Sequence, residues 1–126
     1  MNYILDTNIL IYFLCNPSEL STRAKKIITS EPNLNISIAS FWEIAIKQSI
    51  GKLNIKSTIQ QIESICISRN IKILPISSNE IEGIKTLPQI HKDPFDRLII
   101  SQAKQNNLCI ITSDEIIPKY DIQTLW

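Results

Sequence analysis

Hydrophobic residues along the chain form two kinds of pattern: short continuous runs and longer stretches with helical spacing. The first run, residues 3–5, stops at Asp6, and apolar side chains then recur at helical spacing to residue 14. A second apolar run at 108–112 stops just before Ser113 and Asp114. Continuous runs are typical of strands buried on both faces, whereas spaced apolar residues are typical of amphipathic helices. We therefore expect buried strands that end at acidic residues.

The rest of the pattern alternates between strands and helices. Further strands are expected at 34–38 and 72–76, with an alternating edge strand at 120–126. Further helices are expected at about 22–30, from 40 to near Gly51, and at 58–70, 77–86 and 94–104. Such alternation indicates right-handed βαβ units. The predicted fold class is α/β: one domain over residues 1–126, with three layers and a mostly parallel central sheet of four to five strands flanked by helices.

Helix capping could explain two of the acidic residues. Asp6 stands where a helix N-cap is expected, and its carboxylate could accept a backbone N–H there. Ser40 and Glu43 have the S-x-x-E spacing of a capping box at the expected start of the third helix. Lys47 lies four residues after Glu43, and such a pair on an exposed helix face is worth only about 0.2–0.5 kcal/mol. Capping is thus the plain structural interpretation of both acids.

Four acids nevertheless converge if the sheet is parallel. The carboxyl ends of parallel strands and the amino ends of the following helices share one edge, where ligands bind. Asp6 and Asp114 follow strands, Glu43 lies early in the third helix, and Asp96 opens the last long helix, for which Asp93 is the better cap. Two carboxylates about 4 Å apart repel by roughly 4 kcal/mol at an effective dielectric of about 20. We therefore expect a cation, and oxygen ligands favour Mg²⁺ or Mn²⁺ over zinc.

Composition narrows the classes of protein. The 126 residues are 44% hydrophobic and 20% charged, which is typical of one globular domain. The net charge is only +1, so any binding of nucleic acid must depend on local contacts. Cys15, Cys66 and Cys109 are expected to be buried thiols in a reducing compartment, which favours the cytoplasm. The apolar N-terminus lacks the basic region of a signal peptide, and no run approaches the ~20 apolar residues of a membrane span.

Taken together, the motifs resemble those of the PIN-domain nucleases, and within them the VapC-type toxins of toxin–antitoxin pairs. The matching segments, in the family's order, are Leu5-Asp6-Thr7-Asn8, residues 40–47 followed by Gly51-Lys52-Leu53, residues 91–99, and residues 112–115. The resemblance implies a Mg²⁺- or Mn²⁺-dependent endoribonuclease that hydrolyses RNA phosphodiester bonds. It also implies a small antitoxin protein as partner and a homodimer as the assembly.

The resemblance further implies roles for the acids. Asp6 and Asp96 would bind the principal metal ion, and Glu43 would be a ligand or a base that orients water. Asp114 would bind a second metal ion or lie in the outer shell. Asp93 is the alternative to Asp96, because the family's acid could correspond to either aspartate of this short motif.

Polar and basic residues complete the implied site. Asn8 and Thr112 correspond to the family's polar helpers. Five residues could hold the RNA backbone at the rim: Lys47, Lys52, His91, Lys92 and Arg97.

Other classes of protein fit the sequence less well. His91 is the only histidine, which excludes a metal-free ribonuclease with a histidine acid–base pair. A signalling receiver domain would need an aspartate at the end of the strand at 72–76, and none is present. A phosphatase with an aspartyl nucleophile would normally have a second aspartate in place of Asn8. The remaining alternative is a PIN-like binding or regulatory module that lacks catalytic activity.

Overall fold

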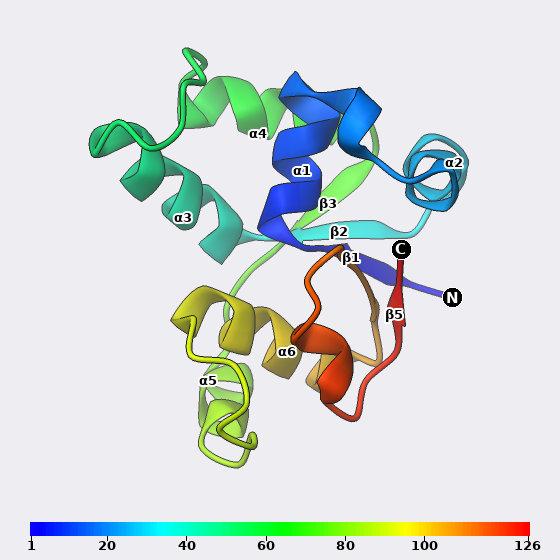
Figure 1. The fold of residues 1–126 in the computed structure, drawn as a ribbon, viewed down its shortest axis with the longest axis vertical. Coiled ribbons are helices and arrows are strands. Elements are labelled where there is room, and N and C mark those ends of the chain that lie inside the picture. The colour runs from blue at the N-terminus through cyan, green and yellow to red at the C-terminus, as the bar shows by residue number, and fades with distance from the viewer.

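The fold is built on one five-stranded parallel sheet (Figure 1). The computed structural model describes all 126 residues, Met1–Trp126. The strands are β1 (Tyr3–Leu5), β2 (Leu34–Ser37), β3 (Ile71–Leu74), β4 (Cys109–Ile111) and β5 (Thr124–Leu125), in the order β3-β2-β1-β4-β5. Every pair of neighbouring strands is parallel. The predicted α/β class is thus confirmed, and the sheet is wholly parallel.

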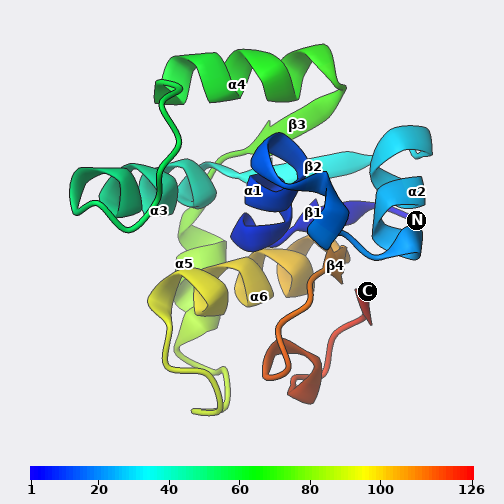
Figure 2. The same cartoon turned by 45° about the horizontal axis from the view of Figure 1, so that its top comes forward.

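Helices cover both faces of the sheet and make three layers (Figure 2). One face carries α1 (Thr7–Cys15), α2 (Thr22–Ser30), α3 (Ile38–Ser49) and α4 (Ile59–Ser68); α5 (Ser78–Ile84) and α6 (Pro94–Asn106) lie on the other. Short 3-10 helices span Pro17–Glu19 and Ile117–Lys119. Successive side chains of β1 alternate between the layers, since Tyr3 and Leu5 pack with α1–α4 whereas Ile4 packs with α6. None of the helices is long and apolar enough to span a lipid bilayer.

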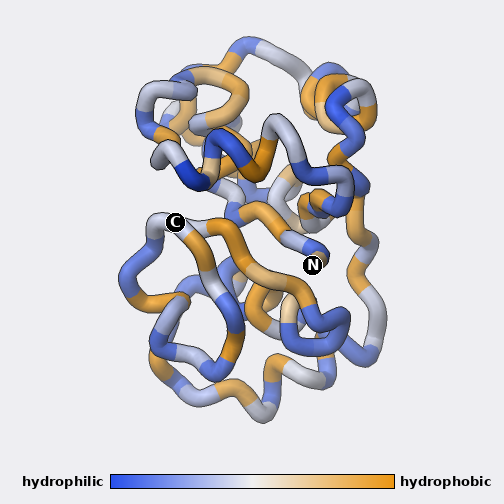
Figure 3. Tube along the Cα trace, turned by 90° about the vertical axis from the view of Figure 1, so that its right-hand side faces the viewer, coloured by the Kyte–Doolittle hydropathy of each residue, from blue (hydrophilic) through white to orange (hydrophobic).

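The register of the central strands sets the position of the site. Leu5 at the end of β1 is level with Ile36 of β2 and with Ile111 of β4. The hydrophobic stretches of these strands cross the middle of the molecule between the two groups of helices (Figure 3). The chain therefore leaves β1 and β4 at the same level, and Asp6 emerges beside the end of β4.

The start of α3 differs from the sequence prediction. The helix begins at Ile38, and the Ser37 hydroxyl caps it by accepting a backbone N–H of the first turn at 3.1 Å. Ser40 lies inside the helix instead, and its hydroxyl is 2.8 Å from that of Thr7. The predicted capping box of Ser40 and Glu43 is therefore wrong, because β2 runs directly into the helix at Ser37. Capping does not explain Glu43.

Other local predictions have mixed outcomes. Ser21, Thr58, Ser77 and Asp93 all accept N–H groups at the start of their helices, in agreement with the expected helix starts near residues 22, 58, 77 and 94. The third strand ends at Leu74, before Pro75, and the last strand is confined to Thr124–Leu125. All three cysteines are free thiols, but only Cys66 and Cys109 are buried. The prediction that Cys15 is buried is wrong, because Cys15 ends α1 at the surface.

Candidate active site

Asp6 lies at the junction between β1 and α1 and is only 3% exposed. Its Oδ2 accepts a hydrogen bond from the Thr112 hydroxyl at 2.8 Å, and that hydroxyl oxygen accepts the Asp114 backbone N–H at 3.0 Å. Although Asp6 occupies the N-cap position of α1, its side chain makes no capping hydrogen bond. Thr112 thus links Asp6 to the loop after β4.

Glu43 reaches the site from α3 and is 7% exposed. Its Oε2 lies 3.0 Å from the Lys47 ammonium, whereas its Oε1 is buried and has no hydrogen-bond partner. A buried acceptor without a partner costs about 1–3 kcal/mol, and more when it is charged. Such groups are rare in native proteins and commonly point to an ion, a water or a functional role.

Asp93 and Asp96 divide two tasks at the start of α6. Asp93 Oδ1 accepts the backbone N–H groups of Phe95 at 2.8 Å and of Asp96 at 3.2 Å, so the prediction that Asp93 is the cap is confirmed. The Asp96 carboxylate takes no part in capping. Its Oδ2 instead lies 2.9 Å from Nε2 of His91.

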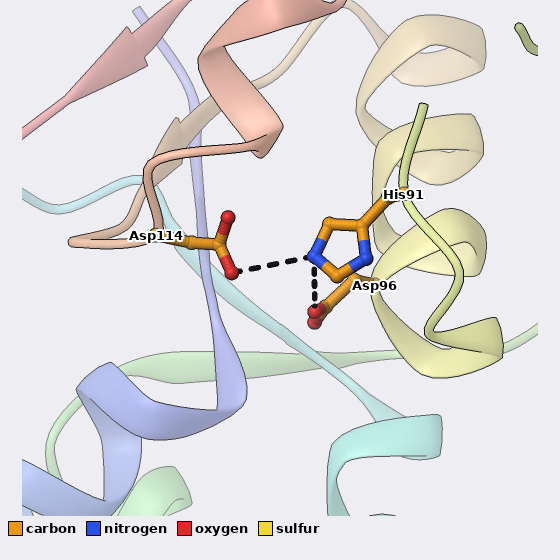
Figure 4. A group of neighbouring side chains, drawn as sticks. All are labelled: His91, Asp96 and Asp114. Carbon is orange, nitrogen blue, oxygen red and sulfur yellow. Dashed lines mark hydrogen bonds and ion pairs between the residues drawn. The ribbon is translucent and has the colours of Figure 1, made fainter. Parts of the chain in front are cut away.

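His91 stands between two of the acids (Figure 4). Its Nε2 is 2.9 Å from Asp96 Oδ2 and 3.3 Å from Asp114 Oδ2. One ligand atom from each of these three residues lies within 4.8 Å of the other two. Asp6 and Glu43 stand outside this tight group. Asp114 Oδ1 also accepts backbone N–H groups of Ile116 and Ile117, so both of its oxygens are occupied.

The acids differ in their electrostatic environment. Burial raises the pKa of Asp6 to about 6, with smaller contributions from the charges of Glu43 and Asp114. Burial also raises the pKa of Asp96 to about 8, and the charges of Asp6, Asp93, Glu43 and Asp114 add to this rise. Burial acts in the same direction on Asp114, but backbone hydrogen bonds and the contact with His91 hold the pKa of Asp114 below its ordinary value. Asp96 is therefore the acid whose ionised form is least favoured by its surroundings.

Two residues predicted to lie at the rim are buried instead. His91 and Arg97 are each 8% exposed. The Arg97 guanidinium donates to the carbonyl oxygens of Pro88 at 2.9 Å and Ile84 at 3.2 Å. The predicted rim position is therefore wrong for both, because Arg97 binds backbone carbonyls and His91 binds the acids.

The remaining polar candidates are nearer the surface. Lys52, Lys92 and Asn8 are exposed, and Lys47 is half-buried beside Glu43. Asn8 makes no side-chain hydrogen bond within the chain, so the structure brings Thr112, but not Asn8, into contact with the acids.

Sequence reasoning missed an aromatic pair and a tyrosine. Trp42 is 61% exposed and meets Phe95 edge to face, with ring centroids 5.1 Å apart. Trp42 directly precedes Glu43 in the sequence, and Phe95 directly precedes Asp96. These two positions next to acids were the signal from which the aromatic pair could have been predicted. The Tyr120 hydroxyl accepts the His91 backbone N–H at 2.7 Å across 29 positions, and no local pattern could have shown this contact.

A surface hollow lies away from the acids. It has a volume of about 1040 Å³, and its lining includes Asn33, Asn70 and Asn106. None of the four acids contributes to its lining. The candidate site is thus defined by its side-chain chemistry rather than by this hollow.

The fold and the site define an α/β protein with acids at the carboxyl edge of a parallel sheet, and comparison gives its family. The model of the PIN domain family matches residues 3–123. The chain therefore belongs to the PIN-domain family. A comparison with curated protein sequences finds no significant match.

Solved structures share the fold. A chain of VapBC2 from Rickettsia felis, bound to a DNA fragment from the promoter, is 21% identical with a TM-score of 0.70, over 99% of this chain and 98% of that one. A chain of VapBC-1 from nontypeable Haemophilus influenzae is 24% identical with a TM-score of 0.68, and the match covers 99% of this chain and 97% of that one. A chain of a toxin–antitoxin complex from Klebsiella pneumoniae is 23% identical with a TM-score of 0.61, and the match covers 90% of this chain and 87% of that one. At these identities the similarity establishes the fold.

Without a divalent cation, the free energy of unfolding should fall as the pH rises from about 4 to about 8. The pKa values of Asp6 and Asp96 are raised to about 6 and about 8, so the native state holds these protons more tightly than the unfolded chain. Their stabilising effect is complete below the unfolded pKa and is lost as the pH passes through the native values. Denaturant unfolding in chelator at pH 5 and pH 8 measures the change.

Asp96→Asn should remove much of this loss and be more stable than wild type at pH 8, by roughly 1–3 kcal/mol. Asp114→Asn is the matched control, because the lowered pKa of Asp114 means that its ionised form stabilises the fold above that pKa. Asp114→Asn should be less stable than wild type at pH 8. Equal shifts in the two variants would contradict the assigned environments.

Proposed function

We propose that the protein is a metal-dependent endoribonuclease and the toxin of a type II toxin–antitoxin pair, acting in the cytoplasm as a homodimer. The carrying observation is the acidic edge, where buried Glu43 Oε1 has no partner and burial with neighbouring charges raises the pKa of Asp96. Membership of the PIN-domain family, whose members are generally nucleases, supports the reaction class. The similar VapBC and toxin–antitoxin structures support the biological setting.

The donor set fits a hard divalent cation. Asp6, Glu43 and Asp96 offer only oxygen atoms, which suit Mg²⁺ or Mn²⁺. These three would hold the ion, whereas Asp114, with both oxygens already accepting hydrogen bonds, would stay in the outer shell. When bound, the cation would supply positive charge for the phosphate and lower the pKa of a water.

The chain's own residues would orient the reactants. Lys47 holds Glu43 Oε2 at 3.0 Å, which would leave Oε1 to face the ion. Exposed Lys52 and Lys92 would supply local positive charge for the RNA backbone. This division suits a chain whose net charge is only +1.

RNA cleavage should require Mg²⁺ or Mn²⁺ and disappear with chelator, because the acids cannot neutralise a phosphate themselves. Purified protein, freed of any partner, would be incubated with a mixed RNA pool with and without each ion. Asp96→Asn should be inactive under all conditions and controls for contaminating ribonuclease. Undiminished cleavage in chelator would sink the proposed function.

Asp93→Asn should retain far more activity than Asp96→Asn. Asparagine caps a helix about as well as aspartate, and its Oδ1 can accept the same two N–H groups. Asp96 does not cap, and we propose that its carboxylate binds the metal ion. The ratio of the two variants' RNA cleavage rates measures the difference. An inactive Asp93→Asn beside an active Asp96→Asn would reverse the assignment.

Expression of the protein alone should slow growth of its host, and a small co-encoded partner should suppress the effect. The acidic edge would accept a basic side chain from such a partner, which would also cover the site. Growth curves with wild type, Asp96→Asn and the partner make the comparison. Normal growth despite folded, metal-loaded wild-type protein would argue against a toxin.

A further inference from the structure

We infer that His91 is a positioning residue and not a metal ligand: its Nε2–H donates to Asp114 while the same nitrogen lies against Asp96, so that the ring fixes the spacing of the two carboxylates. This inference rests on the proposed function for the identity of the cation. The geometry of the ring itself is independent of that function, since it concerns hydrogen bonds within the chain.

The positions of His91, Asp96 and Asp114 are also compatible with a metal site in which all three are ligands. Nε2 lies 2.9 and 3.3 Å from the two carboxylate oxygens. Ligand atoms around a small cation stand about 3 Å apart, given bonds of about 2.0–2.2 Å. Distances alone therefore do not separate a ligand from a hydrogen-bond donor. The second ring nitrogen does.

Nδ1 of His91 faces a donor. The backbone N–H of Asp93 points to it at 3.2 Å, and only a ring nitrogen without a proton can accept that bond. The neutral ring therefore carries its hydrogen on Nε2, and an imidazolium would place a second donor against the Asp93 N–H. Metal-bound histidines normally donate the other ring N–H to an acceptor. His91 has the opposite environment, so its Nε2 is a donor.

Buried polar contacts hold the backbone of the His91 loop from two sides. Arg97 donates to the carbonyl oxygens of Pro88 at 2.9 Å and of His91 at 3.4 Å, and all its hydrogen-bond partners are uncharged. The Tyr120 hydroxyl accepts the His91 N–H at 2.7 Å and donates to the Pro88 carbonyl at 2.8 Å. Arg97 and Tyr120, whose side chains make no hydrogen bond to the acids, thus fix the backbone position of His91.

The consequence is a distinct role for each of the two acids. Asp114 gives one oxygen to His91 and the other to two backbone amides, so it is fully occupied by the chain. Asp96 Oδ2 lies 2.9 Å from His91 Nε2, and the other Asp96 oxygen accepts no hydrogen bond from the chain. His91 therefore leaves one oxygen of Asp96 for the cation while joining Asp96 to an anchored Asp114.

Because His91 is the only histidine, long-range ¹H–¹⁵N NMR of labelled protein reports this ring alone. The expected ring in chelator carries its hydrogen on Nε2 and none on Nδ1, and this is unchanged when Mg²⁺ is added. A hydrogen on Nδ1 would overturn the inference, as would ¹⁴N coupling to bound Mn²⁺ in pulsed EPR. Failure of Mg²⁺ to bind wild type would refute the proposed function, whereas the metal-free tautomer would still decide the geometry.

Variants test the positioning role by Mg²⁺ affinity, measured by calorimetry. His91→Gln keeps an N–H near the place of Nε2 and should bind within about threefold of wild type, whereas His91→Phe should bind at least about tenfold more weakly. Tyr120→Phe should also weaken binding, and Tyr12→Phe, whose lost hydroxyl makes no hydrogen bond within the chain, should not. Wild-type affinity in His91→Phe, or equal weakening by Gln and Phe, would overturn the role. If His91→Phe does not fold, the Tyr120→Phe and Tyr12→Phe pair and the NMR tautomer decide.

Discussion

The parallel pairing of β1 with β4 is the constraint on which the site depends. It sets Leu5 level with Ile111, so that Asp6 and Thr112, 106 positions apart, leave the sheet side by side. The hydrogen bond from Thr112 to Asp6 then directs this carboxylate toward the β4 loop, and the same hydroxyl accepts the Asp114 N–H. Ligand sites of open α/β sheets commonly form at such strand ends. Here one hydroxyl connects the acids of two strands.

The acids of the site differ in how many hydrogen-bond and charge partners the chain provides for them. Asp114 is held by two backbone amides and by His91, and its pKa is lowered, whereas burial and like charges raise the pKa of Asp96 to about 8. Glu43 keeps one oxygen bonded to Lys47 and buries the other without a partner. Polar groups that lack partners in an otherwise well-satisfied protein tend to occur at functional sites. The unsatisfied oxygens mark where a cation would stabilise the native state most.

Sequence patterns predicted what depends on neighbours in the chain. Buried strands followed by helices gave the parallel sheet, and local capping residues such as Asp93 were confirmed. The S-x-x-E match at Glu43 misled because Ser37, nearer the strand, caps α3. Arginine is usually found at the protein surface, yet Arg97 donates hydrogen bonds to loop carbonyls and to Tyr120, 23 positions away in the sequence. Contacts of that kind depend on tertiary packing, so the hydrophobic periodicity of the sequence cannot predict them.

The claim that the acids form a cation site is tested most directly by the melting temperatures of wild type and Asp6→Asn, each with chelator and with excess Mg²⁺. Asp6 makes no side-chain capping bond, so the substitution should cost α1 little. We predict that Asp6→Asn melts higher than wild type in chelator, because repulsion is relieved, and gains less from Mg²⁺, because the native state binds the ion more weakly. Equal melting in chelator together with equal gains from Mg²⁺ would contradict a cation site built on Asp6.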